Sequence, residues 1–161
     1  MSIFALHDAG NVIRFHTVRT IKQTTVAHHS WGVCLILAHI CDPSANLLKA
    51  ALYHDLAESV TGDVPATAKW RSPQLCSALA TLEAEFDRDN NLTAQLTEHE
   101  SALLKWADMY ELVLYAESEI LMGNQLFKPI LRRGMTYLNQ RSAPTLLAQQ
   151  LLKETGYVRD M

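Results

Sequence analysis

Apolar residues recur at intervals of three and four positions along most of the chain, which is the spacing of one face of an α-helix. The clearest example is the series Val26, His29, Val33, Leu37 and Ile40. The alternation of apolar and polar residues that is typical of a half-buried strand is hard to find over four or more positions. The pattern therefore predicts an all-α protein.

Helix boundaries are marked by capping residues and by proline. Thr24 or Thr25 is a suitable N-cap for the first of these helices. The run Asp42-Pro43-Ser44 ends that helix, because proline cannot continue the previous turn, and Ser44 offers the next N-cap. We expect a second helix that ends at Gly62 and places on one face Leu47, Ala50, Ala51, His54 and Glu58.

Three further helices are expected downstream. Residues 93–122 contain neither Gly nor Pro and are rich in good helix formers, and the stretches 73–90 and 144–155 each begin at a proline. A chain of 161 residues fits one domain. We therefore expect residues 1–161 to form a single all-α domain, a helical bundle of about five to seven helices.

Composition excludes several classes of protein. The formal charge is −3, with 14 basic and 17 acidic residues, so no basic excess exists to bind nucleic acid. The longest apolar run, Trp31–Ala38, is too short to span a bilayer, and the N-terminus lacks the basic region of a signal peptide. The three cysteines form no CxxC pair, which favours a reducing compartment. We expect a cytoplasmic protein with no membrane or nucleic-acid partner.

The adjacent residues His54 and Asp55 are the strongest chemical signal. They are flanked by Ala, Leu and Tyr, and two ionisable groups buried side by side are costly unless a partner such as a divalent metal pairs them. An exposed His-Asp pair at a helix edge is the plain structural alternative. Glu58 and Asp63 follow within ten residues, which makes solvation alone a poor explanation of the group.

Two more candidate ligands lie on apolar helix faces elsewhere. His29 shares its face with Val26 and Val33, where a histidine is often a hydrogen-bonded core residue without a ligand role. Asp108 lies on a face with leucines, and an unpaired buried carboxylate there would be costly. No GxSxG, GxxxxGK[ST] or HExxH motif offers a competing catalytic site.

These residues together resemble the metal motif of the HD-domain phosphohydrolases, namely His29, His54-Asp55 and Asp108. One branch is more similar still: Arg14-Phe15, residues 25–30, residues 54–65 and Lys69 resemble the YfbR-like 5′-deoxynucleotidases. The short chain and the run His29-Ser30-Trp31-Gly32 also resemble phage-encoded dATP triphosphohydrolases. The last forty residues add nothing diagnostic to this resemblance.

The resemblance implies roles for individual positions. It implies a divalent transition metal (Co, Mn, Zn, Ni or Fe), and admits an additional Mg, with the metal ligands His29, His54, Asp55 and Asp108. It implies that Glu58 and Asp63 are catalytic. It implies substrate contacts from Arg14, Phe15, Thr17, Thr67 and Lys69, with Thr17 and Thr67 near the base. Two positions depart from the pattern: Phe15 replaces a Trp beside the sugar, and His28 replaces a Glu before the first ligand.

We therefore expect a metal-dependent enzyme that cleaves the 5′-phosphoester of a deoxynucleotide, first of all dATP to deoxyadenosine and triphosphate. A 5′-deoxynucleotidase acting on dNMPs is the alternative, and a non-catalytic HD-type nucleotide-binding module is another. Basic residues lining the space beyond the α-phosphate would separate the first two, the candidates being Arg19, Lys22, Lys69 and Arg71. The resemblance also implies a homo-oligomer, a dimer or hexamer, with 112–121 as a possible contact, in the host cytoplasm if a phage encodes the chain.

Overall fold

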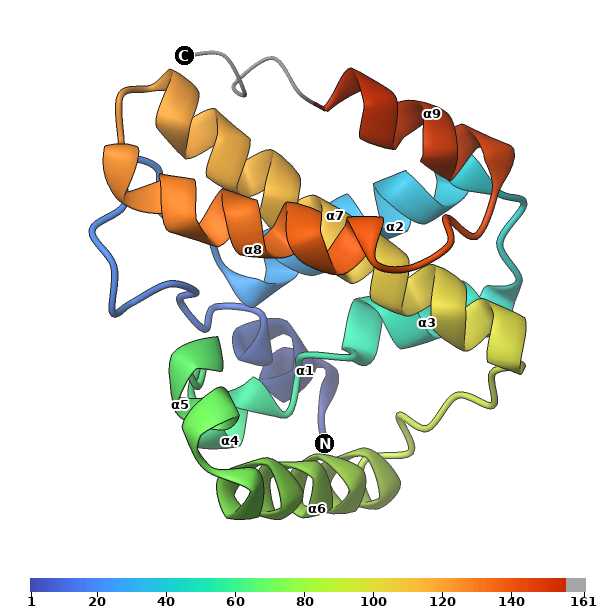
Figure 1. Cartoon of the computed structure of the whole chain (residues 1–161). Coiled ribbons are helices and arrows are strands. Elements are labelled where there is room, and N and C mark those ends of the chain that lie inside the picture. Colours follow the sequence, from blue (N-terminus) through green and yellow to red (C-terminus); the bar gives the residue numbers. More distant parts are fainter. Residues whose placement is uncertain (156–161) are drawn as a thin grey trace.

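The computed structural model describes residues 1–155, and these residues contain nine α-helices and one 3₁₀ helix (Figure 1). The last six positions of the predicted domain, 156–161, lie outside the described residues. The only β pairing in the described part is an isolated bridge between Ile13 and Thr25. The elements are α1 (Ile3–Ala9), α2 (Val26–Ile40), α3 (Ala45–Tyr53), α4 (Glu58–Thr61), α5 (Ala66–Arg71), α6 (Pro73–Asp89), α7 (Glu98–Leu121), η1 (Gln125–Phe127), α8 (Lys128–Asn139) and α9 (Leu146–Glu154).

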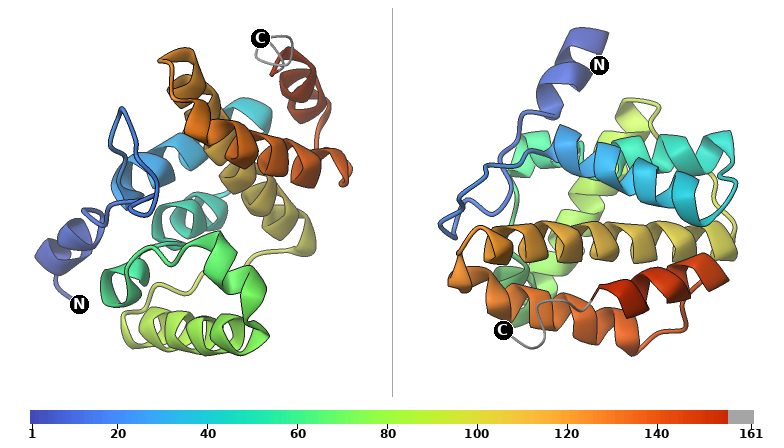
Figure 2. Two further views of the ribbon diagram at one scale, coloured as in Figure 1. Left: turned by 60° about the vertical axis from the view of Figure 1, so that its left-hand side comes forward. Right: turned by 90° about the horizontal axis from the view of Figure 1, so that it is seen from above.

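Helix α7 is the centre of the bundle. It packs against α2 and α3 on one side and against η1 and α8 on the other, so the main helices form layers that the right-hand view of Figure 2 shows edge-on. The largest buried cluster lies between these layers and includes Val33, Leu37, Ala107, Val113 and Leu138. The all-α prediction is confirmed, and the metal-ligand candidates of α2 and α7 lie at the interface of two core helices.

Two of the predicted N-caps are the observed ones. Thr25 is the N-cap of α2 and accepts a hydrogen bond from the His28 amide, and Ser44 caps α3 in the same way through the Leu47 amide. Thr97 and Glu100 form a capping box at the start of α7, so this helix begins five residues later than position 93. Capping chemistry is local, which is why the sequence alone located the starts of α2 and α3.

The helix that was expected to continue to Gly62 is interrupted, so this prediction is wrong in one respect. Helix α3 ends at Tyr53, a turn follows over 54–57, and α4 begins only at Glu58. Gly62 does end α4, with a φ of 71° that favours glycine. Neighbouring residues of an uninterrupted α-helix point about 100° apart. The break instead lets His54 and Asp55, although adjacent, face the same point.

More helices are present than the five to seven expected, because short helices carry weak periodic signals. Helices α1, α4 and α5 have seven, four and six residues. Helix α8 was also not predicted, although it lies along α7 (Figure 1). Helices α4, α5 and α6 form a second group at the edge of the bundle (Figure 2). Within the described residues, no helix is long and apolar enough to cross a membrane.

Candidate active site and metal centre

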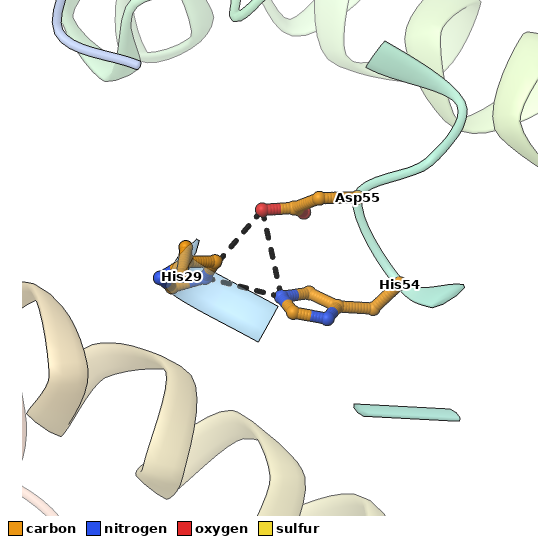
Figure 3. A group of neighbouring side chains, drawn as sticks. All are labelled: His29, His54 and Asp55. Atoms are coloured by element: carbon orange, nitrogen blue, oxygen red, sulfur yellow. Dashed lines mark hydrogen bonds and ion pairs between the residues drawn. The ribbon is translucent and has the colours of Figure 1, made fainter. Parts of the chain in front are cut away.

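Four side chains from three parts of the chain converge beside the core, and Figure 3 shows three of them, His29, His54 and Asp55. His29 comes from α2, His54 and Asp55 from the turn after α3, and Asp108 from the middle of α7. The His29 Nε2 atom lies 3.2 Å from His54 Nε2, 3.5 Å from an Asp55 oxygen and 3.1 Å from an Asp108 oxygen. Candidate ligand atoms of His29, His54 and Asp55 all lie within 4.8 Å of one another. The structure thus brings together all four predicted ligands.

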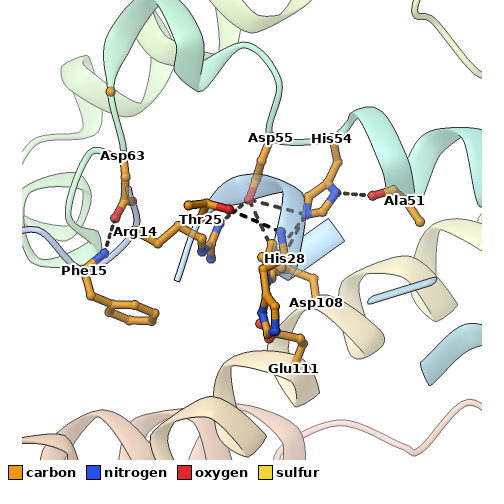
Figure 4. A network of polar contacts seen from close by, with 12 residues as sticks. Arg14, Phe15, Thr25, His28, Ala51, His54, Asp55, Asp63, Asp108 and Glu111 are labelled. Carbon is orange, nitrogen blue, oxygen red and sulfur yellow. Dashed lines mark hydrogen bonds and ion pairs between the residues drawn. The ribbon is translucent and has the colours of Figure 1, made fainter. Parts of the chain in front are cut away.

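Both histidine rings are held through Nδ1. The Nδ1 of His54 lies 2.9 Å from the carbonyl oxygen of Ala51 (Figure 4), and the Nδ1 of His29 contacts the carboxylate of Glu111. Because a neutral imidazole has one N–H and one lone pair, an N–H at Nδ1 leaves the lone pair at Nε2. The two Nε2 atoms face each other, and two converging lone pairs beside two carboxylates suit a divalent cation.

The charge balance around His29 points the same way. Burial works against a charged imidazole here, but the contacts with Asp108 and Glu111 outweigh it and raise the pKa of His29 to about 9. The carboxylates of Asp108 and Glu111 thus favour a positive charge at His29. This charge preference and the set of donor atoms together fit a metal ion.

Asp55 is also paired with Arg14, whose guanidinium contacts its carboxylate and whose side chain is only 11% exposed (Figure 4). Burial alone would raise the pKa of Asp55, but the positive fields of His54, Arg14 and His29 lower it to about 2. Asp55 is therefore ionised across the physiological range, as a metal ligand must be.

Glu58 has the opposite electrostatic character. It is the first residue of α4, only 9% exposed, and its Oε2 atom has no hydrogen-bond partner among the described residues. Burial and the negative charges of Asp55 and Asp63 raise the pKa of Glu58 to about 8. The carboxyl group of Glu58 therefore carries a proton near neutral pH, whereas the nearby carboxyl group of Asp55 does not.

Asp63 holds the loop before α2. Its carboxylate accepts a hydrogen bond of 2.7 Å from the Phe15 amide, where Phe15 has a φ of 58° (Figure 4). The Phe15 ring stacks on Tyr115 with the ring centroids 5.0 Å apart. These contacts fix Arg14 and Phe15 at the rim of the site.

A pocket of about 860 Å³ opens from this cluster. All five predicted substrate contacts line it, as do both predicted catalytic residues and two of the ligands. His29 lies behind the pocket wall with no exposed surface. The predicted residues on the lining are Arg14, Phe15, Thr17, Asp55, Glu58, Asp63, Thr67, Lys69 and Asp108.

Only one of the four basic residues considered for the space beyond the α-phosphate lines the pocket. This residue is Lys69, whereas Arg19, Lys22 and Arg71 do not belong to the lining. The backbone of Lys22 is instead tied to α7 by the Tyr115 hydroxyl, at 2.6 Å from its carbonyl oxygen. Half of the segment 112–121 is buried, and its other five residues are partly or fully exposed, so its role as a subunit contact stays a prediction. The buried residues are Val113, Tyr115, Ala116, Glu119 and Ile120.

His28 does not take part in the cluster. Its Nδ1 atom lies 3.3 Å from the Thr24 hydroxyl and its ring is near Trp31, on the outer face of α2. The position that departs from the family pattern therefore faces away from the ligands.

Sequence reasoning missed two features of the site. Glu111 had a weak signal, since it lies one turn after Asp108 on the same helix. Arg133 lines the pocket from α8, and its guanidinium lies 5.0 Å from the Trp70 ring across the opening. No local motif marks Arg133, because only the packing of α8 on α7 brings it to the pocket.

Comparisons with known proteins agree with this geometry. The family model for YfbR-like 5′-deoxynucleotidases matches residues 3–100. A 5′-deoxynucleotidase of Vibrio vulnificus is 25% identical over 83% of this chain and 81% of its own length. The dATP triphosphohydrolase of cyanophage S-2L is 33% identical over 66% of this chain and 65% of its own length.

The solved structures show the same architecture. The HD phosphohydrolase DatZ of cyanophage S-2L, bound to dA and one catalytic Zn²⁺ ion, superimposes with a TM-score of 0.76 over 96% of this chain and 94% of that one. The two are 24% identical, so this match shows the fold.

Proposed function

Since the chain belongs to the YfbR-like 5′-deoxynucleotidase family, we propose that this metal-dependent hydrolase cleaves dATP to deoxyadenosine and triphosphate. The observation that carries the proposal is one pocket with a four-ligand cluster at its inner end and the basic side chains of Lys69 and Arg133 further out. The phage relative that shares 33% identity is a dATP triphosphohydrolase. This relative favours the triphosphate and adenine as the first substrate to test.

The ligands of the catalytic ion are His29, His54, Asp55 and Asp108. When bound, a divalent ion at such a site polarises a phosphoryl oxygen and lowers the pKa of a coordinated water. Imidazole and carboxylate ligands suit Zn, Mn, Co, Ni and Fe, and Zn²⁺ is the ion in the DatZ structure.

The reaction adds water to the α-phosphorus and breaks the bond between that phosphorus and the 5′ oxygen. The leaving 5′ oxygen takes the proton of a carboxyl group, and a proton of the attacking water restores that carboxyl group. Glu58 is the proton donor to that oxygen, because it is the carboxyl group that is protonated near neutral pH. Asp63, which already accepts the Phe15 amide, orients the rim of the site. Arg14 neutralises charge on the phosphate oxygens while remaining next to Asp55.

The outer pocket binds the remainder of the nucleotide. Thr17 and Thr67 line it beside the stacked ring of Phe15, which forms an aromatic wall next to the sugar. Lys69 and Arg133 supply positive charge for the distal phosphates. Neither of these two forms an ion pair with a carboxylate among the described residues, so both cations are free to meet an anion.

A 5′-deoxynucleotidase acting on dNMPs is the second candidate. The family match and the Vibrio relative, which is similar over most of both chains, favour it. The same inner cluster serves either substrate.

We also propose that the chain forms a homo-oligomer and acts in the cytoplasm. Light scattering, which measures the mass of the protein in solution, tests whether it is an oligomer.

The deciding experiment is product analysis of dNMPs and dNTPs incubated with the enzyme and Mn²⁺, Co²⁺, Zn²⁺ or Mg²⁺. Triphosphate and deoxyadenosine from dATP support the proposal. Orthophosphate from several dNMPs supports the deoxynucleotidase instead. Metal binding without turnover of any nucleotide contradicts both and favours a non-catalytic binding module.

A further inference from the structure

Glu111 is a buried acid that the reaction described above does not use. It lies on α7 one turn after Asp108, with 9% of its surface exposed. Its carboxylate contacts Nδ1 of His29, whose side chain has no exposed surface. A buried carboxylate that meets a buried imidazole costs desolvation unless the pair is well matched.

Space for this carboxylate depends on Gly32, which lies one turn after His29 on α2. A Cβ atom at position 32 would lie 2.8 Å from Glu111 Cγ and 3.3 Å from its Oε1. Glycine within a helix is less favourable than alanine. Gly32 therefore lowers the helix propensity of α2 at the position where this helix must leave room for Glu111.

We propose that Glu111 is a positioning residue that prepares His29 to bind the catalytic ion. The Nδ1–H of His29 donates to Glu111, which fixes the tautomer and directs the Nε2 lone pair toward His54, Asp55 and Asp108. This inference rests on the proposed function, because it assigns the metal to the same four ligands.

The two ligand histidines are supported differently. His54 donates from Nδ1 to a neutral backbone carbonyl, that of Ala51, whereas His29 donates to a carboxylate. A negatively charged acceptor makes the opposite ring nitrogen a stronger metal ligand. Glu111 therefore acts on the affinity for the ion, through His29, without touching the substrate pocket, whose lining does not include it.

The test compares Glu111→Gln with the control Glu117→Gln, a half-buried glutamate on the same helix with no contact to the ligands. Each full-length protein is stripped with a chelator and titrated with Zn²⁺ and Mn²⁺. We expect about 10- to 100-fold weaker binding for Glu111→Gln, the usual effect of losing such a support, and unchanged binding for the control. The visible spectrum of the Co²⁺-loaded protein reports on ligand geometry and should change only in Glu111→Gln.

A merely structural role predicts a different result. Glu111→Gln would then lower the melting temperature of the metal-free chain while metal affinity and the Co²⁺ spectrum stay as in the unmodified protein, and this result overturns the inference. Unmodified protein that binds neither Zn²⁺ nor Mn²⁺ overturns the metal site together with the inference. The proposed substrate is tested separately, since dATP turnover does not enter these titrations.

A second variant tests the same contact from the other helix. Gly32→Ala keeps Glu111 but fills its space, so we expect weaker metal binding although alanine is the better helix former. Combining Gly32→Ala with Glu111→Gln should add little, because both changes disturb one contact. Fully additive losses of affinity would overturn the shared cause.

Discussion

The two ends of the pocket are built in different ways. At the inner end, His29, Asp55 and Glu58 are largely buried, and they come from the core helix α2, the turn after α3 and the start of α4, respectively. At the outer end, Thr67 and Arg133 are exposed side chains on the short helix α5 and on α8.

This difference separates chemistry from specificity. Removing one member of the inner cluster leaves a buried charge unpaired, which is strongly destabilising, whereas an outer side chain can change at little cost to the fold. Because the inner residues tolerate little change, similarity to relatives indicates the class of reaction more firmly than it indicates the substrate. The predictions below test whether the two ends behave as separately as their burial implies.

The largest effect is expected at Asp55. Asp55→Ala removes a ligand oxygen that lies 3.5 Å from both histidine Nε2 atoms and also leaves Arg14 without its partner. We expect loss of metal binding in titrations and at least a ~10³-fold loss of hydrolysis, on the order of the contribution of metal and electrostatic stabilisation. Asp89→Ala, an exposed aspartate at the end of α6, is the control. An unchanged rate in Asp55→Ala would contradict the site assignment.

Glu58 should show a loss of rate without a loss of metal. Glu58→Gln keeps the shape of the side chain and its place at the start of α4 but cannot donate the carboxyl proton. We expect kcat to fall about 10²- to 10⁴-fold, the usual contribution of a general acid, with metal affinity close to that of the unmodified enzyme. Weakened metal binding with a near-normal kcat would assign Glu58 to the ion instead.

At the outer end, Arg133 should affect the substrate preference alone. Arg133→Gln removes the cation beside Trp70, while Arg132→Gln changes the neighbouring residue, which does not line the pocket. We expect kcat/KM for dATP to fall about tenfold in Arg133→Gln, the value of one charge-assisted hydrogen bond, and to be unchanged for dAMP. Equal losses for dATP and dAMP would mean that Arg133 does not contact the distal phosphates.

The same division explains what the sequence could predict. Caps such as Thr25 and Ser44 act within four residues, so their effect can be recognised in the linear pattern. The inner cluster was predictable because buried histidines and carboxylates on apolar helix faces require partners. The break after Tyr53 was not predictable from periodicity, since the apolar spacing continues through it and tertiary contacts decide the local backbone.

Residues supplied by long-range packing escaped sequence reasoning. Glu111 acts through a histidine 82 positions away, and Arg133 reaches the pocket only because α8 packs along α7. Conversely, Arg19 and Lys22 carry the right charge, but the loop that holds them is tied to α7 through Glu119, which accepts hydrogen bonds of 2.8 Å from the amides of Ile21 and Lys22. Charge alone did not reveal which cations face the pocket.

The smallest expected effect is a pH dependence of stability that arises at the inner end. Folding raises the pKa of Glu58 from 4.5 to about 8, chiefly through burial. Folding also raises the pKa of His29 from 6.5 to about 9, because contacts with Asp108 and Glu111 outweigh the opposing effect of burial. Both groups bind protons more tightly in the folded chain, so the stability that they add is lost as pH rises from about 5 to about 9.

Asp55 does not alter this window, because its pKa is lowered to about 2 and the stability that it contributes is lost only on strong acidification. We therefore expect the melting temperature of the chelator-treated protein to fall by a few degrees across the window, roughly the shift that 1 kcal/mol produces in a domain of this size. Glu58→Gln should reduce the slope, whereas Arg133→Gln should leave it unchanged. A slope that changes equally in both variants would mean that the two ends of the pocket are electrostatically coupled, and substrate preference would then depend on the inner cluster as well.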